Sequence, residues 1–278
     1  MTHATPTIDT QLRAEISTLC AAIGLNLKSV PKTRCEAAGL QPAEVTSVEG
    51  RPLLATSIKP KVRVADSAEK NIRPLRILMI GGIHGDEWAS VSVVFSWISA
   101  IAQSDATSSR FHWRIIPLAN PDGFLSHPSK RTNSHGVDIN RNFSTRDWGK
   151  NARKHWAEYT LSDKRRNPGQ LAASEPETRW LQQEISSFAP DVIVAVHAPY
   201  GVLDFDGPSQ QAPERFGHLR LNQLGTYPGS LGNYAGIDRG IPVVTLEFPQ
   251  SHKLPNSRAL QKVWSDMVFW MNRYLRKH

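Results

Sequence analysis

Four residues that can bind a metal ion or transfer a proton follow apolar runs that are typical of buried strands. The runs and the residues after them are Leu75–Ile80 with His84 and Glu87, Val192–Val196 with His197, and Val243–Leu246 with Glu247. In open α/β sheets the functional side chains gather at the carboxyl ends of the strands, so we expect these four to meet at one edge. Two imidazoles and one carboxylate leave an open position on tetrahedral zinc, which is the arrangement of a catalytic zinc site. Glu247 is then the candidate acid–base group.

Each of these residues has a plainer interpretation when it is taken alone. The spacing His-x-x-Glu, seen at His84 and Glu87, occurs by chance in many proteins. A histidine after a strand, such as His197, is more often a hydrogen-bonded structural residue than a metal ligand. The presence of four such residues at the ends of three separate strands favours a metal site instead.

The stretch between residues 120 and 143 carries further polar motifs in a region without a clear hydrophobic period. It contains Asn120-Pro121-Asp122-Gly123, then Arg131, then Gly136-Val137-Asp138-Ile139-Asn140-Arg141-Asn142-Phe143. A long irregular segment inside a compact domain usually carries function. Together with His-x-x-Glu before it and the distant His197 and Glu247 after it, this set resembles the M14 zinc carboxypeptidase family over about residues 74–275.

The resemblance implies a role in metal binding or catalysis for each matching residue. His84, Glu87 and His197 match the ligands of one zinc ion (Zn2+) per chain. Asp138 matches the carboxylate that orients the first histidine, a partner that metal-bound imidazoles usually have. Glu247 matches the general base, which takes a proton from the attacking water and delivers it to the departing amine.

The resemblance also implies contacts with the substrate. Arg131 matches the arginine that stabilises the oxyanion of the transition state. Asn140 and Arg141 match the pair that binds the free α-carboxylate of the substrate, for which the planar guanidinium is well suited. The plainer interpretations are solvated surface positions for the two arginines and a turn position for Asn140.

The family carries a mobile tyrosine that closes over the substrate, and here its position departs from the usual pattern. Tyr227 directly precedes Pro228-Gly229-Ser230, closer to the Gly-Ser pair than is usual, and Tyr234 lies beyond it. We take Tyr227 as the candidate, with a packed core tyrosine as the alternative. Leu231 matches a position that lines the specificity pocket.

Two carboxylates, in the segment Leu203-Asp204-Phe205-Asp206, have no counterpart among these motifs. An ammonium group of a substrate is one partner that would suit them. A solvated loop is the simpler interpretation, and it is the one we expect.

Two further segments are similar to one subfamily, the murein peptide amidases: Ser174-Glu175-Pro176-Glu177-Thr178 and Pro228-Gly229-Ser230. This implies hydrolysis of γ-D-glutamyl-meso-diaminopimelate in a small murein peptide with a free carboxylate. One alternative is a deacylase of N-acyl amino acids similar to succinylglutamate desuccinylases and aspartoacylases, which lack the motifs of residues 120–143. Another is a non-catalytic basic module on a peptidase fold, against which the complete ligand set and Glu247 argue.

Strands and helices alternate along most of the chain. This predicts an α/β fold with a mainly parallel or mixed central sheet and helices on both faces. Expected strands cover residues 75–80, 113–118, 191–196 and 241–248, and expected helices cover 87–103, 174–188 and 260–274. Ser174 and Glu177 have the spacing of a capping box at the start of one helix.

The first 70 residues are weakly patterned and form an expected N-terminal leader to a catalytic domain of residues 71–278. Apolar residues from Ile8 to Ile23 recur at helical spacing, and Gly24 is placed to end that helix. The run Arg51–Lys59 predicts an edge strand. The sequence leaves the role of this leader open.

The composition limits the classes of partner. Hydrophobic residues make up 40% and charged residues 21%, as in globular proteins. The charge of +8 favours acidic partners, but the basic residues are scattered without interleaved aromatic residues, so we expect no nucleic acid. No apolar run is long enough to span a membrane, and the first twenty residues lack the pattern of a secretory signal.

The cysteines bear on the cellular compartment. Cys20 and Cys35 form no Cys-x-x-Cys motif, and two thiols are too few for a disulfide framework. Reduced thiols and a cytoplasmic location are the simplest expectation. One disulfide and a periplasmic or wall-associated location are the alternatives, and the oligomeric state is left open.

Overall fold

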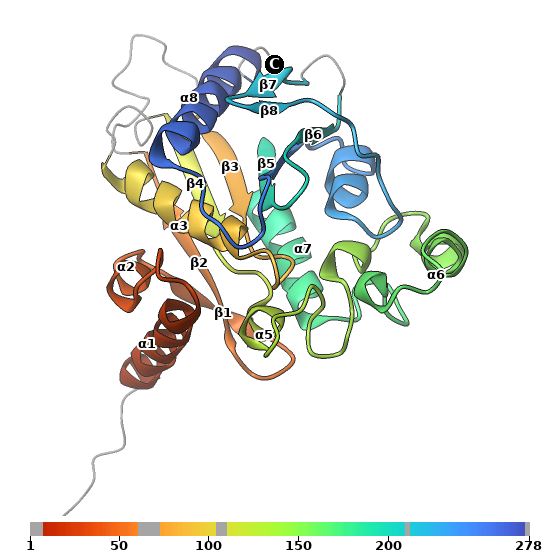
Figure 1. Cartoon of the computed structure of the whole chain (residues 1–278), viewed down its shortest axis with the longest axis horizontal. Helices are drawn as coiled ribbons and strands as arrows, with labels where there is room; N and C mark the ends of the chain where they lie inside the picture. The colour runs from red at the N-terminus through yellow and green to blue at the C-terminus, as the bar shows by residue number, and fades with distance from the viewer. Residues whose placement is uncertain (1–7, 61–72, 104–109, 209–211, 276–278) are drawn as a thin grey trace, which may run out of the picture.

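The computed structural model describes residues 8–60, 73–103, 110–208 and 212–275, and a seven-stranded sheet lies at its centre (Figure 1). The strands run across the sheet in the order β1-β2-β4-β3-β5-β9-β6. Their bounds are β1 Gln41–Thr46, β2 Pro52–Ile58, β3 Leu75–Ile80, β4 Phe111–Ile116, β5 Val192–His197, β6 Leu203–Asp206 and β9 Val243–Glu247. The predicted boundary between residues 70 and 71 lies outside the described residues.

The middle of the sheet is parallel and its two edges are antiparallel. β4, β3, β5 and β9 pair in parallel, whereas β1, β2 and β6 join antiparallel. Most residues of the parallel strands are apolar and buried because both faces of the sheet are covered, and every residue of β5 is buried. All four parallel strands therefore end at the same edge of the sheet.

Helices cover both faces of the sheet, and each face has its own hydrophobic core. One core contains side chains of α1 (Ile8–Asn26), α3 (Trp88–Gln103) and α8 (Ser257–Tyr274). The other contains side chains of α7 (Pro176–Phe188) and of the short helix η5 (Gly232–Ile237). The predicted α/β fold with a mixed sheet is confirmed, and each predicted strand from β3 onward begins and ends within two residues of its expected bounds.

The N-terminal segment adds two helices and two strands to this core. α1 continues to Asn26, so the prediction that Gly24 ends it is wrong. Gly24 instead allows a close approach of the chain, because a Cβ there would lie 3.0 Å from the backbone nitrogen of Lys32, the first residue of α2 (Lys32–Glu36). Cys35 of α2 forms a disulfide with Cys20 of α1, so the thiols are paired rather than reduced.

The outer strands and α7 differ from their sequence predictions. The strand predicted at Arg51–Lys59 is β2, and it is not at the edge because β1 pairs with its outer side. The predicted capping box of Ser174 and Glu177 is wrong. The N-cap of α7 is Glu175 rather than Ser174, and the Glu175 side chain makes no capping hydrogen bond. The Glu177 carboxylate instead accepts a hydrogen bond from the backbone nitrogen of Val48 at 3.2 Å.

Residues 120–173, which show no clear hydrophobic period, contain short helices that were not predicted from the sequence. They are α5 (Pro121–Leu125), the 3-10 helix η2 (Ile139–Arg141), α6 (Trp148–Tyr159) and the 3-10 helix η3 (Lys164–Arg166). The Asn120-Pro121-Asp122-Gly123 motif is the start of α5. The Asn120 side chain accepts a hydrogen bond from the Gly123 nitrogen at 2.9 Å, as an N-cap does, and proline follows at the first helical position.

A second, two-stranded sheet lies beside α8. It consists of the antiparallel strands β7 (Arg215–Phe216) and β8 (Leu219–Arg220). No helix within the described parts of the chain is long and apolar enough to cross a lipid bilayer.

Candidate metal centre and active site

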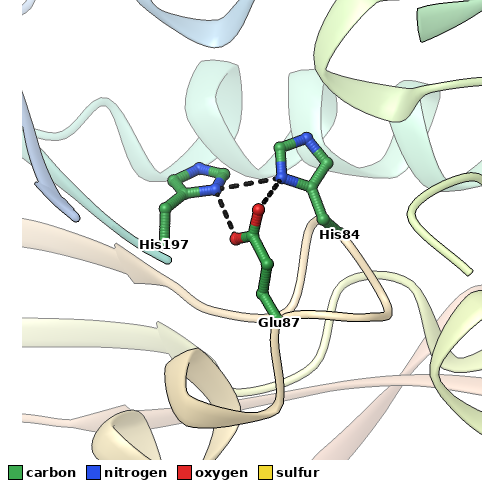
Figure 2. A group of neighbouring side chains, drawn as sticks. All are labelled: His84, Glu87 and His197. Carbon is green, nitrogen blue, oxygen red and sulfur yellow. Dashed lines mark hydrogen bonds and ion pairs between the residues drawn. The ribbon is translucent and has the colours of Figure 1, made fainter. Parts of the chain in front are cut away.

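The three predicted metal ligands lie together at the carboxyl edge of the parallel strands (Figure 2). His84 Nδ1 is 2.6 Å from Glu87 Oε1 and 3.2 Å from His197 Nδ1, and Glu87 Oε2 is 2.9 Å from His197 Nδ1. One ligand atom from each residue lies within 4.8 Å of the others, and all three residues are buried. Among the described residues this is the one such group of three or more histidine, cysteine or acidic side chains.

This set of donors fits a zinc ion. The Nδ1 atoms of His84 and His197 face each other across 3.2 Å, so at most one of them can carry a proton towards the other. The Glu87 carboxylate faces both rings. A cation shared by the three donors satisfies all of them, and two imidazoles with one carboxylate are ligands of known catalytic zinc sites. Three protein ligands leave a fourth position open.

Close backbone packing positions the loop that carries His84 and Glu87. Directly after β3, the Gly81 nitrogen donates a hydrogen bond to Ile116 O at 2.8 Å, at the end of the neighbouring strand. Gly85 packs against α5, and a Cβ at this position would lie 2.2 Å from the carbonyl carbon of Gly123. Glycine is therefore required where the metal-binding loop meets the Asn-Pro-Asp-Gly segment.

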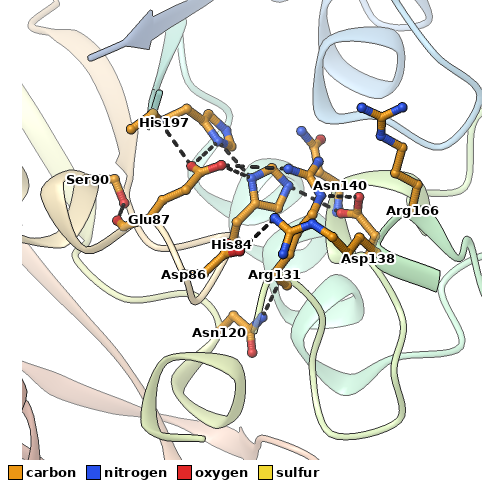
Figure 3. A network of polar contacts seen from close by, with 12 residues as sticks. His84, Asp86, Glu87, Ser90, Asn120, Arg131, Asp138, Asn140, Arg166 and His197 are labelled. Carbon is orange, nitrogen blue, oxygen red and sulfur yellow. Dashed lines mark hydrogen bonds and ion pairs between the residues drawn. The ribbon is translucent and has the colours of Figure 1, made fainter. Parts of the chain in front are cut away.

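Asp138 connects His84 to Arg131 (Figure 3). Asp138 Oδ1 is 3.3 Å from His84 Nε2, and Arg131 Nε donates a hydrogen bond to Asp138 Oδ2 at 2.8 Å. Arg131 Nη1 lies 3.7 Å from Glu87 Oε1, so the guanidinium reaches the rim of the metal group. Asp138 is thus placed to orient both the imidazole and the arginine.

Opposite charges keep the carboxylates of this group ionised. Burial alone would raise the pKa of Glu87, but His84 and His197 hold it well below its usual range. Burial would likewise raise the pKa of Asp138, but Arg131 and His84 outweigh it and lower that pKa strongly. Burial lowers the pKa of Arg131, yet Asp138 and Glu87 raise it overall. Glu87 is therefore an anion, as metal binding requires.

Asn140 and Arg141 of η2 line the same pocket as the metal group. Asn140 Oδ1 accepts a hydrogen bond from the Leu231 nitrogen at 2.8 Å, which leaves the amide NH2 group as the donor for a ligand. Arg141 Nη1 donates to Asn140 O at 2.7 Å, and its guanidinium carbon lies 4.6 Å from the centre of the Tyr227 ring. Burial lowers the pKa of Arg141, so an anionic ligand would gain a charge-assisted contact with a desolvated cation.

The structure separates the two candidate tyrosines. Tyr227 lines the pocket, and its hydroxyl donates a hydrogen bond to Leu224 O at 3.2 Å. Tyr234 is buried in the core, where its ring centre lies 5.3 Å from that of Phe143. Tyr227 can therefore contact a ligand and Tyr234 cannot. Leu231 also lines the pocket.

Glu247 ends β9 beside the last residue of β5. In the register of this parallel pair Glu247 is the partner of His197, and both side chains line the pocket. Glu247 Oε2 is buried and has no hydrogen-bond partner in the described part of the chain. Burial raises the pKa of this carboxyl group, although His197 opposes the effect. A buried carboxyl with a raised pKa next to a metal group has the properties of an acid–base catalyst.

The expectation that Asp204 and Asp206 lie in a solvated loop is wrong. Leu203–Asp206 is β6, which pairs antiparallel with β9. Leu203 and Phe205 belong to the hydrophobic core, whereas Asp204 and Asp206 line the pocket, whose volume is about 630 Å³. Burial raises the pKa of both carboxyls, and the neighbouring Asp204 helps to raise that of Asp206 to about 7. The alternation of apolar and acidic residues is the signal that indicates such a strand.

The outer wall of the pocket contains residues that no sequence motif indicates. They come from α6 and η3 and include His155, Tyr159, Arg165 and Arg166. Arg165 Nη2 donates a hydrogen bond to Asp86 Oδ2 at 2.7 Å, which joins this wall to the metal-binding loop. The wall is therefore anchored to the loop that carries His84 and Glu87.

Replacing Asp206 with asparagine is expected to raise stability above pH 7 and to change it little below pH 4. The pKa of about 7 in the folded protein exceeds the ordinary value of 3.8, so stability falls as pH rises between these values. Asparagine removes this loss, which is roughly 1–4 kcal/mol at high pH. Melting temperatures of both proteins between pH 4 and pH 8 measure the effect, with Glu44→Gln on β1 as the control. A difference that does not vary with pH would contradict it.

Known proteins match this chain in sequence and in structure. The zinc carboxypeptidase family, Peptidase M14, matches residues 43–213, more than half of the chain. Murein peptide amidase A of Escherichia coli strain K12 is 29% identical over 256 residues, a match that covers 90% of this chain and 96% of that protein.

Two solved structures show the same fold. The murein-tripeptide amidase of Escherichia coli O157 has a TM-score of 0.52 at 24% identity, over 86% of this chain and 92% of that one. Carboxypeptidase A of Helicoverpa armigera has a TM-score of 0.64 at 15% identity, over 99% of this chain and 82% of that one.

The family match contains the metal group together with Arg131, Asn140 and Arg141, and it ends before Glu247. The structure brings Glu247 to the same pocket from the next strand of the sheet. Sequence, fold and site therefore agree, and the chain belongs to the M14 zinc carboxypeptidase family of hydrolases.

Proposed function

We propose that this hydrolase cleaves the amide bond before a C-terminal residue with a free carboxylate, and that its substrate is the γ-D-glutamyl-meso-diaminopimelate bond of a murein peptide. The observation that carries the first part is that Asn140 and Arg141 line one pocket with the metal group. The similarity to murein peptide amidase A over 90% of the chain supports the second part.

The residues of the site have complementary roles in this reaction. A zinc ion held by His84, Glu87 and His197 would polarise the scissile carbonyl and lower the pKa of a bound water from about 15.7 toward 7. Glu247 takes a proton from the attacking water and delivers it to the departing amine. Arg131 donates to the oxyanion that develops on the carbonyl oxygen, because its guanidinium reaches the rim of the metal group.

Asn140 and Arg141 fix the end of the substrate. The Asn140 amide and the Arg141 guanidinium donate hydrogen bonds to the two oxygens of the terminal carboxylate. The stacking of Arg141 on Tyr227 holds the guanidinium in place for this contact. An enzyme built this way acts at the end of a peptide rather than within it.

Arg141→Ala is expected to lower kcat/KM on the free-acid peptide by roughly ten- to a hundredfold, since one charge-assisted contact is worth about 1.5–3 kcal/mol. On the same peptide amidated at its C-terminus, the slow residual rate should hardly change. Arg131→Ala is the matched comparison, and it should slow both peptides because the oxyanion forms in both. Steady-state rates on L-Ala-γ-D-Glu-meso-diaminopimelate and on its C-terminal amide measure these effects.

Equal wild-type rates on the free acid and the amide would contradict the exopeptidase proposal. Faster hydrolysis of N-acyl amino acids than of the murein tripeptide would favour the deacylase alternative. The cytoplasmic location stays a prediction, which fractionation of the producing cells checks.

A further inference from the structure

The turn between Arg131 and Asp138 is folded around the side chain of Asn133. Asn133 Oδ1 accepts hydrogen bonds from the backbone nitrogens of His135 and Val137, each at 3.1 Å. The Asn133 nitrogen also donates to Val137 O at 3.0 Å, and the residue is buried. The turn therefore joins the two residues whose hydrogen bond directs the arginine to the rim of the metal group.

Two buried carboxylates hold the amide of Asn133 from its other side. Its Nδ2 atom donates to Glu175 Oε2 at 2.7 Å and to Glu177 Oε2 at 3.1 Å, so each amide hydrogen has an acceptor. Both acids lie at the start of α7 and are buried. Glu177 Oε1 accepts a further hydrogen bond from the nitrogen of Val48, which lies between β1 and β2. The turn is thereby tied to α7 and to the N-terminal segment.

The surrounding groups require an amide at position 133. The oxygen of Asn133 faces two backbone N–H groups, and its nitrogen faces two carboxylates. Aspartate has the same shape but would place a third carboxylate oxygen against Glu175 and Glu177. Like charges at this distance repel, and a buried carboxylate without a donor is unfavourable. Burial already raises the pKa of Glu177, so the position disfavours further negative charge.

Asp138 has contacts outside the turn that keep it in place. The Asp138 nitrogen donates to Asn167 O at 2.8 Å, and Asp138 Oδ1 accepts a hydrogen bond from the Asn140 nitrogen at 2.9 Å. Arg131 reaches its partners through a long side chain, with Nη1 3.7 Å from Glu87 Oε1. A small change in the backbone of the turn would therefore move the guanidinium of Arg131 while Asp138 stays fixed.

We propose that Asn133 is a positioning residue for hydrolysis and that Glu175 and Glu177 act with it. Together they hold the turn so that the Arg131 guanidinium stays on Asp138 and reaches the developing oxyanion. None of the three acting side chains is among the described residues that line the pocket, so their effect passes through Arg131. The role of Arg131 rests on the proposed function, whereas the contacts of Asn133 do not.

Asn133→Asp should lower kcat on the murein tripeptide by roughly ten- to a hundredfold, because a catalytic group misplaced by about 1 Å can cost that much. KM and zinc content should change little, since Arg141 and the metal ligands are not touched. Adding Glu177→Gln should restore most of the lost rate, because the glutamine amide can donate to the introduced carboxylate. Asn222→Asp, at an exposed asparagine, is the control and should behave as the wild type.

A double-mutant cycle separates positioning from a general loss of structure. In the Arg131→Ala background, Asn133→Asp should lower kcat little further, because the group that Asn133 positions is absent. An equal loss with and without Arg131 would overturn the proposal, and so would full activity of Arg131→Ala. Where Asn133→Asp does not fold, the same cycle with Glu177→Gln decides. This variant adds no charge, but its amide cannot satisfy both Asn133 and Val48, so a smaller loss of the same kind is expected.

Nuclear magnetic resonance of the zinc-loaded protein tests the positioning without a substrate. The Nε–H signal of Arg131 is identified by its loss in Arg131→Ala. It should shift or broaden in Asn133→Asp and return when Glu177→Gln is added. If the murein tripeptide is not cleaved, the proposed function fails and this signal decides alone. An unchanged signal in Asn133→Asp would refute the positioning, and a displaced signal that the second substitution restores would support it.

Discussion

Replacing Glu247 with glutamine is expected to lower kcat by at least about a hundredfold, the usual worth of a positioned acid–base group. Glutamine keeps the size of the side chain but cannot accept the proton of the attacking water. The metal group is not touched, since His84, Glu87 and His197 make their contacts without Glu247. The zinc content should therefore stay near that of the wild type.

Product formation from the murein tripeptide, followed by mass spectrometry, measures this effect. Zinc content by elemental analysis and product binding by calorimetry show whether the site is otherwise intact. Glu158→Gln on the exposed side of α6 is the control and should behave as the wild type. Near-normal turnover of Glu247→Gln would mean that another group activates the water.

Replacing His197 with alanine is expected to remove most of the metal, from about one zinc per chain to a small fraction. The loss follows because only His84 and Glu87 would remain of a three-residue site. Hydrolysis should fall to near background. The fold should survive, since His197 is the last residue of β5 and the apolar run before it stays intact.

Elemental analysis after dialysis and circular dichroism measure the two parts of this prediction. A chelator applied to the wild type should reproduce the loss of activity, and added zinc should restore it in the wild type alone. His127→Ala, at an exposed histidine, is the control for removing an imidazole. Full zinc occupancy in His197→Ala would exclude His197 from the metal site.

The fold could be predicted from the sequence where its elements are buried on both sides. β3, β5 and β9 consist mostly of apolar residues, so each can be recognised from its own sequence without knowing which strands pair with it. β1 escaped prediction because its residues Gln41–Thr46 show no alternation, and its strand state depends on pairing with β2. α6 escaped because Trp148 and Ala152 are its two buried residues, too few for a recognisable stripe.

The candidate site shows the same division. His84 and Glu87 lie three positions apart in one short motif, and Asp138 lies within another, so the sequence alone was enough to propose them. The contact between Leu231 and Asn140 spans 91 positions of the sequence and depends on how η5 packs against η2. The surroundings of Asp204 and Asp206 depend on the pairing of a four-residue strand with β9, so a short polar segment was mistaken for a loop.

The pairing of His197 with Glu247 in the register of β5 and β9 has a consequence for how this scaffold can diversify. Adjacent strands are held about 4.8 Å apart by their backbone hydrogen bonds, so the spacing of ligand and base is set by the sheet itself. Asn140, Arg141 and Tyr227, by contrast, lie on short helices and turns outside the sheet. Mutations in these connecting segments can therefore change which peptide the enzyme binds, while the distance between His197 and Glu247 stays the same.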